Sequence, residues 1–380
     1  MKRLILFAAV LVAAAWYPTA LTAGVNPKDP AAIRVHRTPK DAAYKWTNGT
    51  QLTVVGKMFT DTPNPWWRID TDKYKGFTEA EQYKIHSPSG VSLSFRTNSS
   101  SIKVRLRYGW LNRSVTTNFL AHRGVDLYVH EKGQWVWAGS GAPGIGKEEQ
   151  EFSVVLNMEP STKEFLLYLP IYNEVNSIEI GTEQGSVLEA APNPFRHRVG
   201  IYGSSYTHGV CCGRAGMTYP AQFSRSTGIQ LLSIAMSGSC KMQSYVRDAI
   251  CDADVEAMIF DTFSNPTIDQ IRERLFPFIE AIQKAHPGIP LIFQRTIYRT
   301  KRNYNTAEAK KEADRIAFAD SMMTVACKRY KDVYYIHPNA TDPKGEAALD
   351  GVHPSDYGYT LWEQSIEKKV LRILRKYGIR

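Results

Sequence analysis

The sequence lacks any long run of lysine and arginine, and after its first residues it lacks any apolar stretch long enough to cross a bilayer. Its 47 lysine and arginine residues outnumber its 37 acidic residues, but they are scattered over the whole chain of 380 residues. A net charge of +10 spread in this way does not form the concentrated basic surface that binds nucleic acid. We therefore expect no nucleic-acid partner and no stable membrane anchor. The excess of positive charge favours an anionic glycan or membrane surface only weakly.

Cysteine is also scarce, with five residues that all lie in the second half of the chain: Cys211, Cys212, Cys240, Cys251 and Cys327. An odd number of cysteines cannot all pair within one chain. A disulfide from one of the first two to Cys240 or Cys251 is one open alternative, and free thiols are the other. No pair of cysteine or histidine residues has the spacing of a zinc site, so we predict no metal and no cofactor.

The first residues have the pattern of an export signal. Lys2 and Arg3 form a positive start, residues 4–15 form an apolar segment, and Ala23 offers a small residue for cleavage. The apolar segment is too short to span a bilayer, although a retained anchor is the alternative interpretation. We predict a signal peptide over residues 1–23 and therefore a periplasmic or secreted protein.

Residues 24–195 lack helical periodicity. Short runs that alternate apolar and polar residues follow one another between turn residues, at 91–95, 102–108, 126–130, 135–137, 152–156, 164–169 and 177–180. Many short strands separated by turns are typical of a β-sandwich or a jelly roll. We predict an all-β, jelly-roll-like sandwich domain over residues 24–195. Trp135 and Trp137 share one strand face, which favours a place in the core or at an interface, and stacking on a sugar ring is the alternative.

From Val199 the pattern changes to strands that alternate with helices. Apolar runs occur at 199–202, 229–235, 255–260, 290–293 and 333–336, and helical segments at 267–285, 306–329 and 354–377. This alternation predicts a parallel sheet with right-handed crossovers. The proline-containing segment 191–197 reads as a linker, so we place the second domain at residues 196–380.

Polar residues that fit acyl-transfer chemistry follow the predicted strands. Ser205 comes directly after the first strand, behind Gly203, which permits a sharp turn. Asp350 and His353 lie three residues apart on a predicted turn, so the carboxylate can hold the imidazole while the imidazole reaches a distant serine. A capped turn with no catalytic role is the alternative for this pair. Ligands bind at the carboxyl ends of strands in open α/β sheets, which favours the catalytic interpretation.

These residues resemble the four sequence blocks of the SGNH (GDSL-like) hydrolases. Gly203-Ser204-Ser205 resembles the first block, with Ser205 in the nucleophile position, and Asp350-Gly-Val-His353 resembles the last, which carries the acid and the base. Ser237-Gly238 resembles the second block, whose glycine gives a backbone N–H to the oxyanion hole, and Asn265 resembles the third, whose amide is another donor. The resemblance covers roughly the second half of the chain. It implies a doubly wound parallel sheet of the flavodoxin-like, three-layer α/β/α kind, and a Ser205–His353–Asp350 mechanism with Ser205, Gly238 and Asn265 as oxyanion donors.

One residue departs from the family pattern. The family usually has aspartate between the glycine and the serine of the first block, and this chain has Ser204 there. The support of the nucleophile loop is therefore an open question. Two further residues, His208 and Arg214, are candidates for lining the site and contacting substrate. Asn265 precedes a proline, so a plain turn is the alternative for that residue.

Export, a sandwich domain and this set of blocks together resemble two-domain carbohydrate esterases. We therefore predict a carboxylic ester hydrolase that removes acetyl or other small acyl groups from a carbohydrate or polysaccharide. A lipid or thioester hydrolase of the same fold is one alternative. A glycan-binding protein with a degenerate site is another, and Ser204 keeps it open.

Overall fold

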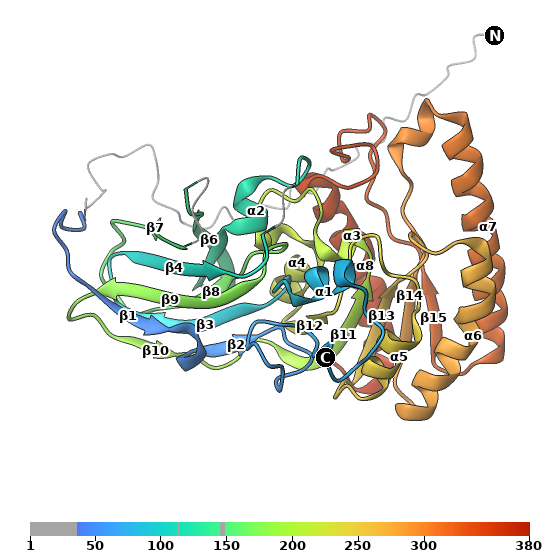
Figure 1. Ribbon diagram of the computed structural model, residues 1–380, viewed down its shortest axis with the longest axis horizontal. Helices are drawn as coiled ribbons and strands as arrows, with labels where there is room; N and C mark the ends of the chain where they lie inside the picture. Colours follow the sequence, from blue (N-terminus) through green and yellow to red (C-terminus); the bar gives the residue numbers. More distant parts are fainter. Residues whose placement is uncertain (1–35, 112–113, 145–148) are drawn as a thin grey trace, which may run out of the picture. The chain divides into compact units, whose positions relative to one another are not determined.

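The computed structural model describes residues 36–111, 114–144 and 149–380 (Figure 1). Residues 37–380 form one compact unit. The predicted signal peptide, residues 1–23, lies outside the described residues. Among the residues that are described, no helix combines the length and the apolar character that crossing a membrane requires.

The first part of the chain forms two antiparallel sheets. Their strands are β1 (Tyr44–Asn48), β2 (Thr53–Val55), β3 (Ser92–Thr97), β4 (Ile102–Tyr108), β5 (Val125–Glu131), β6 (Gln134–Gly141), β7 (Glu149–Val155), β8 (Lys163–Tyr168), β9 (Val175–Glu183) and β10 (Leu188–Ala190). One sheet has the order β1-β9-β4-β7, and the other has the order β10-β3-β8-β5-β6, with β2 paired to β3. These sheets confirm the predicted β domain at the N-terminal side, and two short helices that the sequence pattern did not predict, at 79–86 and 119–123, lie between its strands.

The packing of these sheets follows from the alternation in the sequence. In β4, Ile102, Val104 and Leu106 are fully buried while the basic residues between them point outward. They join one apolar cluster with Phe95 of β3 and Ile178 of β9, so side chains from both sheets form a shared core. Removal of this apolar surface from water holds the two sheets face to face as a sandwich.

The second part forms a five-stranded parallel sheet of order β12-β11-β13-β14-β15. The strands are β11 (Arg196–Gly203), β12 (Ile229–Ser233), β13 (Ala257–Asp261), β14 (Leu291–Gln294) and β15 (Val333–Ile336). The helices are α3 (Ser205–His208), α4 (Tyr219–Thr227), α5 (Ser244–Cys251), α6 (Ile268–Ala285), α7 (Thr306–Arg329) and α8 (Asp356–Leu374). The predicted α/β fold is confirmed.

Alternate residues of each strand pack against different helices, which gives three layers. Val199 and Ile201 of β11 share a cluster with α8, whereas Tyr202 shares a cluster with α5, α6 and α7. Because β11 lies between β12 and β13, the strand order reverses at β11. The carboxyl end of β11 is therefore the topological switch point, where open α/β sheets bind their ligands.

The remaining short elements join these layers. They are η2 (Gly49–Gln51), α1 (Glu79–His86), α2 (Phe119–Arg123), η3 (Ala215–Met217), η4 (Thr300–Asn303) and η5 (Arg375–Tyr377). The segment between β2 and β3, which includes α1, places Met58, Ile69 and Ile85 in the same apolar cluster as strands β11 to β13. The predicted division into residues 24–195 and 196–380 stays a prediction, because this early segment shares a core with the later sheet.

Candidate active site

Ser205 lies at the switch point as the first residue of the short helix α3. The strand β11 ends at Gly203, and Ser204 caps the helix by accepting a hydrogen bond from the N–H of Tyr206. A side chain at Gly203 would collide with Thr207, because a Cβ atom there would lie 2.0 Å from Thr207 Oγ1. Glycine is therefore required for the tight strand-to-helix turn that presents Ser205.

His353 and Asp350 meet Ser205 in a continuous series of hydrogen bonds. His353 Nε2 lies 2.9 Å from Ser205 Oγ, and His353 Nδ1 lies 2.8 Å from Asp350 Oδ2. The other carboxylate oxygen accepts the N–H groups of Val352 and His353, which fixes the turn. A carboxylate beside Nδ1 assigns the imidazole proton to that nitrogen, so Nε2 is free to accept the proton of Ser205. The structure thus brings together three of the residues that the sequence singled out.

The charge of Asp350 is secured by the same contacts. Burial by itself would raise the pKa of this carboxyl group, but the hydrogen bonds from His353 and from two backbone N–H groups outweigh burial and hold the pKa well below its usual range. Asp350 is therefore ionised whenever the imidazole needs a negative partner.

Asp261 supplies the support that Ser204 leaves in question. It ends β13, is fully buried, and its Oδ2 accepts the Oγ–H of Ser204 at 2.7 Å, the N–H of Ser204 at 3.1 Å and the Oγ1–H of Thr207 at 3.0 Å. Burial raises the pKa of Asp261 to about 6 in spite of these bonds. The carboxylate that the nucleophile loop lacks in its own sequence comes from the neighbouring strand.

Gly238 and Asn265 follow the two strands that flank β11. The chain after β12 continues alongside β11, since the N–H of Met236 donates to the carbonyl of Gly203 at 2.9 Å, and Gly238 follows with a φ of +69°. Asn265 follows β13, and its Oδ1 accepts the N–H of Cys240 at 3.1 Å. Because Oδ1 is engaged, the NH2 group is the part of this amide that is left to donate. Strand order therefore places Gly238 and Asn265 on opposite sides of the turn that carries Ser205.

His208 is fully buried rather than exposed in the site. Nε2 lies 2.7 Å from the carbonyl oxygen of Ile171, and Nδ1 accepts the N–H of Ser237 at 3.2 Å. Both ring nitrogens are engaged inside the protein, so the structure does not bring His208 into a position to contact substrate.

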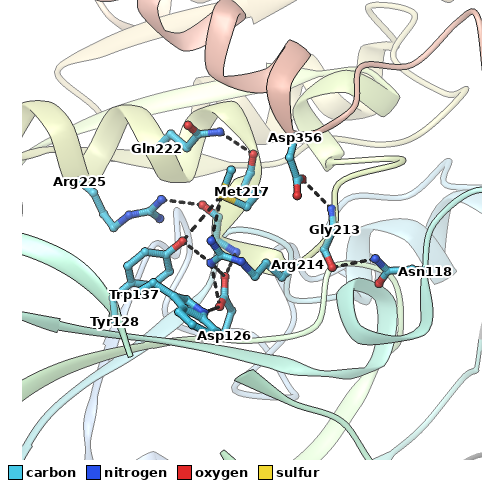
Figure 2. Close-up of polar contacts among 11 residues, drawn as sticks. Asn118, Asp126, Tyr128, Trp137, Gly213, Arg214, Met217, Gln222, Arg225 and Asp356 are labelled. Atoms are coloured by element: carbon cyan, nitrogen blue, oxygen red, sulfur yellow. Dashed lines mark hydrogen bonds and ion pairs between the residues drawn. The ribbon is translucent and has the colours of Figure 1, made fainter. Parts of the chain in front are cut away.

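Arg214 is held by the β domain (Figure 2). Its Nη1 group contacts both carboxylate oxygens of Asp126, at 3.1 and 2.9 Å, and the hydroxyl of Tyr128 at 2.7 Å. Asp126 has no exposed surface, and it also accepts the N–H of Gly216. The guanidinium group that we expected to contact substrate thus forms an ion pair with a buried carboxylate, and the pair holds the loop that follows α3.

The same loop is fixed at two further points (Figure 2). The N–H of Gly213 donates to Asp356 at 2.6 Å, and its carbonyl accepts the amide of Asn118 at 2.8 Å. Trp137 donates its Nε1–H to Asp126 at 3.1 Å and is 51% exposed, so this tryptophan does not lie in the core. The loop beside the site is thus built jointly by the β domain and by α8.

Cys211 touches the acid of the site. Its Sγ lies 3.7 Å from Asp350 Oδ2, and potential ligand atoms of Cys211, Asp350 and His353 all lie within 4.8 Å of one another. Burial raises the pKa of the Cys211 thiol to about 12, so the sulfur is protonated and acts as a hydrogen-bond donor to the carboxylate rather than as a thiolate ligand. All five cysteines are free in the structure, which corresponds to the second of the two alternatives left by the sequence.

Comparisons with known families match both parts of the chain. Residues 196–372 match the model of the GDSL-like lipase/acylhydrolase family, and residues 44–188 match a model described as the N-terminus of SGNH-hydrolase-type esterases. The second model is named GxDLY, and residues 124–128 read Gly-Val-Asp-Leu-Tyr, which includes Asp126 and Tyr128. No curated protein sequence matches the chain.

Solved structures are similar over most of the chain. A protein from Bacteroides ovatus described as a GDSL-like lipase is 31% identical, with a TM-score of 0.83 over 88% of this chain and 98% of the other. The salicylyl-acyltransferase SsfX3 from a tetracycline biosynthetic pathway is 18% identical, with a TM-score of 0.65 over 89% and 99% of the two chains. A family two carbohydrate esterase from Clostridium thermocellum, in complex with cellohexaose, is 11% identical, with a TM-score of 0.55 over 77% and 94%. At this low identity, the similarity to the last two structures shows a shared fold only.

Proposed function

Because the chain belongs to the GDSL-like lipase/acylhydrolase family, we propose that it is a serine esterase that removes acetyl groups from a carbohydrate. The observation that carries this proposal is the hydrogen-bonded series from Ser205 through His353 to Asp350. A hydroxyl group, an imidazole with a free Nε2 lone pair and a carboxylate that is hydrogen-bonded to the imidazole are the components of acyl transfer to water.

In the first half of the reaction, Ser205 Oγ attacks the carbonyl carbon of the acetyl ester while His353 Nε2 takes the hydroxyl proton. Asp350 stabilises the imidazolium that forms. The tetrahedral intermediate then collapses, the bond to the sugar oxygen breaks, and His353 returns its proton to that oxygen. The products of this half are the free sugar hydroxyl and an acetyl group on Ser205.

In the second half, water attacks the acetyl-enzyme. His353 again accepts a proton and then returns it to Ser205 Oγ, so acetic acid leaves and the site is restored. In both halves the negative oxygen would be held by the N–H groups of Ser205 and Gly238 and by the amide of Asn265. Loss of one such donor typically costs about 3–4 kcal/mol of barrier.

The carbohydrate part of the proposal draws support from the arrangement of the whole chain. A parallel α/β layer preceded by antiparallel β-sheets is shared with the family two carbohydrate esterase that binds cellohexaose. Trp137 adds an exposed indole that is held at its Nε1 by Asp126, and aromatic faces of this kind stack on sugar rings. Export through residues 1–23 to the periplasm or the medium, where polysaccharides lie, is part of the same proposal.

Hydrolysis of 4-nitrophenyl acetate by residues 24–380 tests the esterase, with Ser205→Ala as the key variant. Ser321→Ala is the matched control, since Ser321 is an exposed serine on α7. We expect activity in the parent and in Ser321→Ala, and a loss of about a thousandfold or more in Ser205→Ala. Equal rates in the parent and in Ser205→Ala would refute the assignment of the nucleophile.

The acyl and alcohol preferences test the carbohydrate part separately. We expect acetate release from acetylated oligosaccharides, and poor turnover of 4-nitrophenyl esters with long acyl chains. A higher kcat/KM on long-chain esters than on acetate would favour a lipid hydrolase of the same fold.

A further inference from the structure

The oxyanion hole of the proposed reaction depends on a loop that is held at three points. The N–H of Met236 bonds the carbonyl of Gly203 at 2.9 Å, the N–H of Ser237 bonds His208 Nδ1 at 3.2 Å, and the N–H of Cys240 bonds Asn265 Oδ1 at 3.1 Å. Gly238 lies between the second and third points, so its backbone N–H takes its direction from them.

We propose that His208 is a positioning residue that holds the Met236–Ser237 peptide, next to the peptide that carries the N–H of Gly238, and so aims the backbone N–H of Gly238 at the oxyanion. This inference rests on the proposed function. His208 itself touches neither the substrate nor the reacting atoms, because its side chain is fully buried. It acts through Ser237, and its effect is on the charge that develops in the transition state.

The hydrogen bonds of His208 fix its tautomer. A backbone carbonyl can only accept, so the Nε2 atom that lies 2.7 Å from the oxygen of Ile171 must carry the proton. A backbone N–H can only donate, so the Nδ1 atom opposite Ser237 must present its lone pair. Ser87 Oγ, 3.0 Å from Nε2, adds a second contact on the protonated side. The ring is therefore neutral, with its acceptor facing the oxyanion loop.

The surroundings keep the ring neutral and immobile. The imidazole stacks on Tyr172 with 4.4 Å between ring centroids and 4° between planes. Burial lowers the pKa of His208 well below its usual value, and the positive charges of Arg68 and Lys84 lower it further. A second proton, which would fill Nδ1 and break the bond to Ser237, is thus disfavoured over the working range of pH.

The contacts of His208 also join the oxyanion loop to the early part of the chain. Ile171 and Ser87 both precede β11, and the buried Arg68 donates to the carbonyl groups of Ser87 and Ser233 at 2.6 and 3.4 Å. The residue that orients the catalytic loop is therefore itself oriented from the β domain. A histidine that only filled space would not need these opposed donor and acceptor contacts.

Two substitutions of His208 separate positioning from packing. In His208→Asn the Oδ1 atom lies one bond from Cγ, as Nδ1 does, so it can still accept from Ser237 while the contact to Ile171 is lost. In His208→Gln the terminal amide reaches the distance of Nε2, so it can still donate to Ile171 while the acceptor for Ser237 is lost. Both variants remove the ring that stacks on Tyr172, so they are matched in the packing that they lose.

We expect His208→Gln to lower kcat on 4-nitrophenyl acetate by about 10- to 100-fold with little change in KM, because a misplaced donor acts on the transition state. His208→Asn should keep kcat within about threefold of the parent by the same reasoning. A boronic acid that forms a tetrahedral adduct on Ser205 should lose affinity for His208→Gln in parallel with kcat. Equal kcat losses in the two variants, in step with their melting temperatures, would overturn the positioning role.

A measurement on the parent keeps the inference testable if both variants fold poorly. Nitrogen-15 NMR of labelled histidine should show His208 with a protonated Nε2 and an unprotonated Nδ1, unchanged between pH 5 and 9. A proton on Nδ1 would overturn the proposal. If the proposed function is wrong, Ser205→Ala should be as active as the parent. If Ser205→Ala is inactive while His208→Gln is fully active, only the inference about His208 is refuted.

Discussion

Ser204 Oγ donates a 2.7 Å hydrogen bond to Oδ2 of Asp261, and this contact joins the turn that carries the nucleophile to the end of the adjacent strand. The backbone N–H of Ser204 reaches the same oxygen at 3.1 Å. The other carboxylate oxygen, Oδ1, is buried and has no hydrogen-bond partner among the described residues. Oδ2 alone therefore binds the turn. Oδ1 is removed from water without gaining a hydrogen bond, which disfavours the ionised form and raises the pKa of Asp261.

Replacement of Asp261 by asparagine should change how stability depends on pH. Burial raises the folded-state pKa of Asp261 from 3.8 to about 6, so its stabilising protonated form is complete below pH 4 and is lost as the pH rises through 6. Asp261→Asn keeps an acceptor for Ser204 and cannot ionise. We compare the free energy of unfolding of the two proteins. The difference, variant minus parent, should rise by on the order of 3 kcal/mol from pH 4 to pH 7. Urea unfolding at several pH values measures this difference, and a difference that is flat with pH would contradict it.

Asp261 also illustrates what the sequence could and could not predict. The block around Ser205 and the Asp350–His353 turn were found because each is short and follows a strand, and topology alone brings strand ends together. The departure at Ser204 was visible, but its compensation was not, since Asp261 is 57 residues away and stands just after the predicted strand 255–260. Only the register that pairs Gly203 with Asp261 reveals the contact.

The contacts of His208 and Arg214, which we predicted to line the site and contact substrate, were hidden from the sequence for a related reason. Both residues are near Ser205 in the chain, but the side chain of His208 bonds to Ile171 and that of Arg214 bonds to Asp126. The sequence does contain a pattern that predicts the partner of Arg214. In the run 126–130, Asp126 and Tyr128 lie on the same strand face, which indicates a carboxylate on a buried face. A buried charge in such a place requires a partner.

Replacement of Asp350 by asparagine should slow the reaction while leaving the turn in place. The asparagine oxygen can still accept the N–H groups of Val352 and His353, but its NH2 group would face Nδ1 and favour the tautomer with the proton on Nε2. Nε2 could then no longer take the proton of Ser205. We expect kcat to fall by about a thousandfold or more with KM nearly unchanged, from steady-state kinetics on 4-nitrophenyl acetate. A fall of less than tenfold would argue against the role of Asp350.

Replacement of Asn265 tests the amide donor. Asn265→Ala removes the NH2 group and should lower kcat by about a hundredfold or more, with a small change in KM. Asn265→Asp keeps the acceptor for the N–H of Cys240 and puts a negative charge where the oxyanion forms, so its loss should be larger than that of alanine although its fold is better preserved. Kinetics and melting temperature measured together decide this. A smaller loss in Asn265→Asp than in Asn265→Ala would place the oxyanion elsewhere.

The thiols offer a chemical check on the fold. All five cysteines are free, with Cys327 exposed, Cys251 half-buried and the remaining three buried. Without reductant, a thiol reagent should therefore count five groups in denaturant, whereas in the native protein Cys327 should react quickly and Cys251 slowly. A count of three in denaturant would mean that one disulfide forms and that the first alternative from the sequence was correct.

Removal of Arg214 should expose how far the β domain supports the site. Arg214→Met leaves the fully buried carboxylate of Asp126 without the cation that it bonds. Because the Arg214 side chain is itself 24% exposed, we expect a loss of stability below the about 3–5 kcal/mol that is typical of a fully buried pair. Burial already raises the pKa of Asp126, and without Arg214 it should rise further, so the loss of stability should be smaller at pH 5 than at pH 8. The double variant Asp126→Asn/Arg214→Met removes both charges and should recover part of the stability.

The same substitution should also affect activity. Since Asp126 also holds Gly216, Arg214→Met should lower kcat/KM by releasing the loop that carries Cys211 to Asp350. Unfolding curves and kinetics at the two pH values measure these effects, and a single variant as stable and as active as the parent would mean that the loop keeps its position without the β domain.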